Sequence, residues 1–117
     1  MISSEQATDA VHGLLSSDHQ LIEALTALSR GRAWFRPDPT KDVVPAAEHV
    51  GEVVKLAFAC GAMCGAAGLS ELGRVCDRIG NLLTVAVRAG SQAKGVKDDL
   101  ILLVSHAREL LAAASRI

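Results

Sequence analysis

The chain has 117 residues, of which half are apolar and 21% are charged, with a formal net charge of −1. This length predicts a single domain spanning residues 1–117, and the apolar share is enough to close a core, which excludes a wholly disordered chain. The near-neutral charge disfavours nucleic-acid and anionic-membrane partners, because proteins that bind them usually have a basic excess. Aromatic residues are scarce, and the apolar residues are mainly Ala, Leu and Val, which is typical of packed helices rather than of a sheet.

The cysteine count and the apolar runs indicate the expected location. Three cysteines are an odd number and few for a disulfide framework, so we expect reduced thiols and a cytoplasmic protein. The N-terminus has no basic patch followed by an apolar run, so we expect no signal peptide. The longest apolar stretch, residues 56–69, is shorter than the roughly 18 residues that a membrane span needs, so we expect no membrane partner.

The first predicted helical segment lies between residues 4 and 30. Ser17 could cap a second helix with Gln20 at its third position, so this segment is either two helices broken near Ser16 or one bent helix. The helical prediction rests on apolar residues spaced by three and four: Val11, Leu14, Leu15, Leu21, Ile22, Leu25 and Leu28.

Three further helices are predicted along the rest of the chain. Residues 31–44 contain prolines 37 and 39 and are expected to form a connection. Pro45 suits the first position of the next helix, which should end at Gly68. Ser70 is expected to be the N-cap of another helix that ends at Gly90, and a last helix follows a polar linker at residues 91–97. No segment alternates with period two, so we predict an all-α, up-and-down antiparallel four-helix bundle with an additional or bent N-terminal helix. Its core is expected to contain Leu25, Leu56, Ile79 and Leu103.

The helix predicted over residues 45–67 has an unusual outward side. At about 100° per residue, the core side gathers Val53, Leu56, Ala57, Cys60, Met63, Cys64 and Ala67, with His49 among them. Phe58 falls on the opposite side, where its helical neighbours are small residues and one lysine: Gly51, Lys55, Ala62 and Gly65. A bulky ring among small residues suggests a contact surface for a partner, and packing beneath the N-terminal segment is the alternative.

From Phe58 onward, the sequence resembles histidine-containing phosphotransfer (HPt) domains, which are four-helix bundles with an outward histidine on their second bundle helix. Small residues follow Phe58, Gly68 comes ten residues later, and the next helix opens with Leu72 and Arg74. The final segment, residues 104–111, also looks like the last helix of these domains, so the resemblance covers about residues 45–115.

This chain departs from the HPt pattern at the position that matters most. Phe58 stands at the phosphoacceptor position, and Gly61 stands where the family has a lysine. A benzyl ring cannot form a phosphoramidate, and without the lysine there is less positive charge to attract a phosphoryl group. The resemblance therefore implies a phosphotransfer scaffold without phosphotransfer, and we expect no enzymatic activity and no cofactor.

The remaining histidines and cysteines leave alternatives open. His49 is expected to be a hydrogen-bonded packing residue, whereas His12, His19 and His106 could each be exposed, so a relocated phosphoacceptor stays possible. Cys60 and Cys64, spaced by four, could ligate a metal together with Cys76 and His49. All three cysteines fall on apolar stripes, so we interpret them as core residues and expect no metal.

The function predicted from these features is a non-catalytic HPt-like signalling or adaptor module of a bacterial two-component system. It would bind a receiver domain or a histidine kinase through Lys55, Phe58, Gly61, Ala62 and Gly65. A structural homodimer formed through small-residue faces and a metal-binding bundle using Cys60, Cys64 and Cys76 are the alternatives, beside a phosphotransfer protein with a relocated acceptor histidine.

Overall fold

The computed structural model describes residues 2–16, 20–22, 40–89 and 95–115, and of residues 40–47, 89 and 115 it describes the backbone alone. Its helices are α1 (Ser4–Leu15), α3 (Thr40–Ala66), α4 (Ser70–Ala89) and α5 (Val96–Ser115), and residues 20–22 are also helical. Every element within these residues is a helix, which confirms the all-α class. None of the helices described is long and apolar enough to cross a membrane.

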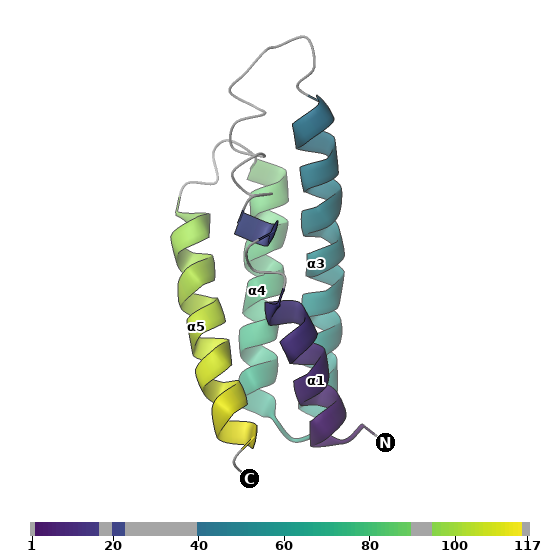
Figure 1. Cartoon of the computed structure of the whole chain (residues 1–117), viewed down its shortest axis with the longest axis vertical. Coiled ribbons are helices and arrows are strands. Elements are labelled where there is room, and N and C mark those ends of the chain that lie inside the picture. Colours follow the sequence, from purple (N-terminus) through teal and green to yellow (C-terminus); the bar gives the residue numbers. More distant parts are fainter. Residues whose placement is uncertain (1, 17–19, 23–39, 90–94, 116–117) are drawn as a thin grey trace.

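The long helices α3, α4 and α5 lie side by side and alternate in direction, while the short helix α1 lies in front of them (Figure 1). α4 packs against both α3 and α5, and α1 packs against the same two helices. α4 therefore lies between α3 and α5 on one side of the molecule. α3 and α5 each have a side that α4 does not cover.

Helix α1 begins and ends at residues whose side chains complete its hydrogen bonds. Ser3 is the N-cap: its Oγ accepts a hydrogen bond from the Gln6 N–H at 3.1 Å, and the Gln6 Oε1 accepts one from the Ser3 N–H at 2.9 Å. At the other end the Ser16 N–H donates to the His12 carbonyl at 3.0 Å and the Ser16 hydroxyl donates to the Gly13 carbonyl at 2.8 Å, and the helix stops at Leu15. α1 thus ends near Ser16, which agrees with one of the two alternatives that the sequence left open, whereas the proposed Ser17 cap lies outside the described residues.

Helix α3 begins earlier than the sequence predicts. We expected Pro45 at its first position, but the helical backbone already starts at Thr40, inside the predicted connection. Pro45 is therefore the sixth residue of the helix and not its first. It keeps a helical φ, but it cannot donate a hydrogen bond to the Lys41 carbonyl, and its ring crowds that carbonyl. The helix ends as expected: Gly68 has a φ of 84°, and the Leu69 N–H donates to the Cys64 carbonyl at 2.8 Å in a Schellman motif.

The core lies between the facing stripes of the four helices. Ile79 is buried as predicted, and Leu103 is only partly buried against the core. The prediction for Leu56 is wrong, because this side chain is 39% exposed, and Leu25 lies outside the described residues. Other buried side chains include Val11, Leu14, Val50, Val53, Ala57, Val75, Leu83, Leu100, Val104 and Leu111.

Candidate functional site

The outward side of α3 is the surface that the sequence predicts to contact a partner. It has no charged residue after Lys55. The helix turns only a narrow stripe to the core, formed by Val50, Val53, Ala57, Cys60 and Cys64. Because this stripe is narrow, Leu56 falls outside it, which explains its exposure. The exposed residues beyond Lys55 are all apolar or small: Leu56, Phe58, Ala59, Ala62, Gly65 and Ala66. We call these six residues the α3 face.

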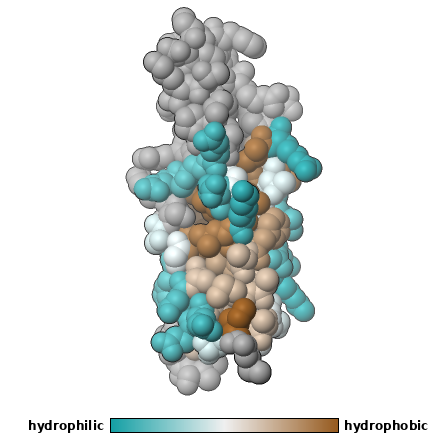
Figure 2. Space-filling view, turned by 90° about the vertical axis from the view of Figure 1, so that its right-hand side faces the viewer, coloured by the Kyte–Doolittle hydropathy of each residue, from teal (hydrophilic) through white to brown (hydrophobic). Residues whose placement is uncertain are grey.

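The space-filling view toward α3 shows how this helix presents itself. A continuous field of brown and pale brown occupies the middle and lower part of the described surface, with hydrophilic teal residues above it and at its edges (Figure 2). This pattern agrees with the uncharged residues 56–69 at the end of α3. An apolar helix face of this kind is uncommon on a protein that has no partner.

Phe58 lies at the edge of the α3 face, where it meets α4. Its side chain is 39% exposed, so the outward orientation predicted from the sequence is present. The ring is nevertheless in contact with the neighbouring helix: a Cβ placed on Gly80 would lie 2.9–3.1 Å from three of its ring carbons. The ring therefore covers Gly80 of α4 and leaves one side open to a partner.

Gly61 does not belong to the exposed face. It is buried, and a Cβ at this position would overlap the carboxylate of Asp77 and lie 3.2 Å from the Gly73 carbonyl oxygen. In turn, a Cβ on Gly73 would lie 3.0 Å from the Gly61 carbonyl oxygen. The two glycines let the α3 and α4 backbones approach closely. Of the predicted binding residues, Lys55, Phe58, Ala62 and Gly65 are exposed, and Gly61 is closed off by α4.

The three cysteines lie buried between α3 and α4 as free thiols. Burial raises the pKa of Cys60 to about 11 and that of Cys76 to about 12, and it also raises the pKa of Cys64. Metal binding needs deprotonated thiolates, so this environment works against it. No group of three His, Cys, Asp or Glu side chains within the described residues is arranged to hold a metal ion.

The histidines occupy separate places. His12 is exposed on α1, His19 lies outside the described residues, and His49 is half-buried with an Nε2 that has no hydrogen-bond partner among the described residues. The hydrogen-bonded role expected for His49 is therefore absent from the described part of the chain.

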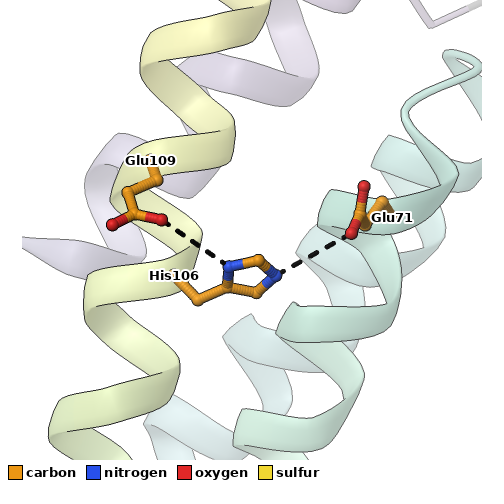
Figure 3. Close-up of polar contacts among 3 residues, drawn as sticks. All are labelled: Glu71, His106 and Glu109. Carbon is orange, nitrogen blue, oxygen red and sulfur yellow. Dashed lines mark ion pairs between the residues drawn. The ribbon is translucent and has the colours of Figure 1, made fainter.

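His106 lies between two carboxylates at the surface of α4 and α5 (Figure 3). Its Nε2 is 3.9 Å from Glu71 Oε1 of α4, and its Nδ1 is 4.0 Å from Glu109 Oε2 of its own helix. No signal in the sequence predicts this cluster, because Glu71 approaches His106 only through the packing of the two helices. The two negative charges would repel an incoming phosphoryl group, which argues against His106 as a relocated phosphoacceptor.

Comparison of the chain with protein-family models, with curated proteins and with solved structures found no match. The resemblance to HPt domains thus rests on the residues alone.

Proposed function

We propose that this chain is a non-catalytic protein-binding module that docks a partner on the α3 face. The observation that supports the proposal best is the run of exposed residues without charge from Leu56 to Ala66, next to a phenylalanine that is supported on one side by Gly80. A half-exposed aromatic ring held in place by its own scaffold loses little entropy on binding, which suits it as an interface anchor.

The small residues of the α3 face indicate the shape of the partner. Ala59, Ala62, Gly65 and Ala66 leave the helix backbone accessible, so a second helix can approach closely, and Phe58 and Leu56 border this shallow strip. Lys55 provides the nearest positive charge, one turn before Phe58 and Ala59. The partner that fits is an amphipathic helix or helix pair with an apolar stripe and an acidic residue beside it.

The finer proposal is an HPt-like four-helix bundle acting in a two-component system, with a receiver domain or histidine kinase as the partner. It is supported by the position of Phe58 on the long helix α3, by Gly68 at the end of that helix and by the following helix α4. Such a module would bind the partner without accepting a phosphoryl group, because residue 58 is a phenylalanine.

Isothermal titration of the full chain against purified receiver domains and kinase dimerisation domains encoded beside it in the genome tests the proposal. We expect binding by the unmodified chain and a loss of about tenfold or more in affinity for Ala62→Arg, because a charged side chain would stand in the middle of an apolar contact. Ala112→Arg places the same side chain at an exposed position of α5 and should leave the affinity unchanged.

Equal affinities of Ala62→Arg and Ala112→Arg would exclude the α3 face as the docking surface. Binding that is lost in Ala62→Arg but is given only by proteins outside two-component systems would retain the docking face and exclude the HPt-like role.

A further inference from the structure

A second apolar surface lies on the other flank of α4, in the groove between α4 and α5. The groove is lined by Arg78, Asn81, Leu82, Val85, Asp99, Leu102 and Leu103, with a volume of about 490 Å³. Leu102 is 69% exposed and Val85 is 57% exposed, which makes them the most exposed large apolar side chains of the described residues. Both belong to this one groove. The close-packed glycines Gly73 and Gly80 face α3, so this surface is separate from the α3 face.

Two opposite charges flank the apolar part of the groove. Arg78 lies about one turn before Leu82 on α4, and Asp99 lies about one turn before Leu102 on α5. Since α4 and α5 run antiparallel (Figure 1), Arg78 lies toward the start of α4 and Asp99 toward its end, with the apolar side chains between them. Neither charge forms an ion pair with a described residue.

We propose that this groove binds a second copy of the same chain in a two-fold symmetric dimer. A two-fold axis between Arg78 and Asp99 places Arg78 of each copy opposite Asp99 of the other, so the surface is complementary to itself in charge. The same operation brings Leu102 of each copy against Leu82 and Val85 of the other, which removes the most exposed apolar side chain from water. This self-complementarity is the reason for choosing a second copy as the partner. The groove has a positive end, an apolar centre and a negative end, so a copy rotated by 180° presents the opposite charge at each end and an apolar surface at the centre.

Analytical ultracentrifugation of the full chain over micromolar to millimolar concentrations tests the dimer directly. We expect a reversible monomer–dimer equilibrium that Leu102→Arg shifts to monomer. Since Leu102 is largely exposed, its replacement leaves the fold intact, which circular dichroism verifies. A chain that stays monomeric over the whole range overturns the proposal, as does a dimer that Leu102→Arg leaves unchanged.

Reversing the charge of Arg78 or of Asp99 tests the two-fold arrangement of the proposed dimer. Arg78→Asp and Asp99→Arg should each weaken self-association at least tenfold, because like charges then face each other across the axis in both places. A mixture of the two variants should form a heterodimer, since each pair across the axis is again of opposite sign. Asp98→Arg, in the same first turn of α5 but outside the groove, is the matched control and should dimerise normally. If the mixture does not associate, the two-fold arrangement is wrong.

Discussion

At the scale of single residues, the buried thiols make a pH-dependent contribution to stability. The pKa of Cys76 is about 12 and that of Cys60 about 11 in the folded chain, against an ordinary value of 9.0, because burial penalises the thiolate. The unfolded chain therefore loses these protons first as the pH rises. Thiol protonation favours the folded state fully below about pH 8, and this contribution is lost as the pH passes from about 9 toward the folded-state pKa.

Urea unfolding between pH 7.5 and about 10.5 measures this effect. We expect the free energy of unfolding to fall by up to about 1.4 kcal/mol per pH unit for each thiol above pH 9. The chain has no tyrosine, so no phenol titrates in the same window. Cys76→Ala should cost roughly 1 kcal/mol at pH 7.5 through a small cavity and should show a shallower decline above pH 9. An unchanged slope in Cys76→Ala would contradict the assignment.

Some residue-scale features could be predicted from the sequence and others could not. The outward position of Phe58 and the burial of Ile79 follow from helical periodicity alone. The ring contact of Phe58 with Gly80, the closure of Gly61 by Asp77 and the approach of Glu71 to His106 depend on how α3, α4 and α5 are positioned against one another. Periodicity contains no information on that positioning, and the exposure of Leu56 was missed for the same reason.

At the scale of elements, glycines determine how closely α3 and α4 pack. A Cβ on Gly73 would lie 3.0 Å from the Gly61 carbonyl oxygen, which is a backbone atom and cannot rotate away. We expect Gly73→Ala to destabilise the fold by about 1–3 kcal/mol, because the helices must move apart. Gly51→Ala on α3 meets no atom within 4 Å and is expected to stabilise by up to about 1 kcal/mol through helix propensity. Thermal unfolding of the two variants should shift in opposite directions, and equal shifts would mean that Gly73 has no packing role.

The helix ends of α1 and α3 were largely predictable, since a capping residue or a glycine marks them in the sequence. Gly68 ends α3 as expected. Ser70, expected as the N-cap of the next helix, is instead the first residue of α4, and the Leu69 carbonyl accepts the hydrogen bond from the Gly73 N–H. The capping box of Ser3 and Gln6 has the spacing of a known signal and could have been found. The early start of α3 at Thr40 could not, because proline favours the first position of a helix and disfavours helical backbone in the residue before it.

At the scale of the whole molecule, the absence of a phosphoacceptor on the α3 face leads to a direct prediction. After incubation with an autophosphorylated histidine kinase and a receiver domain, the chain should contain no acid-labile phosphate. Phe58 lacks a nucleophilic atom, and His106 is flanked by Glu71 and Glu109. Phosphoprotein electrophoresis with a functional phosphotransfer domain as positive control measures this. A labelled band that disappears on replacement of His12, His19, His49 or His106 would identify a relocated acceptor.

The α3 face lies on the outward side of α3 and the groove lies between α4 and α5, so partner binding and self-association should be separable. On α4, Gly73 and Gly80 face α3, while Leu82 and Val85 line the groove beside α5. No residue of the α3 face lines the groove. Mutations at distant sites that share no contacts act independently. A substitution on the α3 face should therefore leave self-association unchanged, and a substitution in the groove should leave partner binding unchanged. One chain has a mass of 12.2 kDa, so the dimer mass is twice that. With the partner bound, we expect a complex of two chains and two partners.

Light scattering coupled to size exclusion measures these masses. Leu102→Arg should give a complex of one chain and one partner with unchanged affinity at the α3 face, whereas Ala62→Arg should remain a dimer that has lost the partner. The double variant should be a monomer without a partner and should still unfold cooperatively, because both replaced side chains are exposed. Loss of partner binding in Leu102→Arg would mean that the partner requires the dimer, and the two surfaces would then form one composite site.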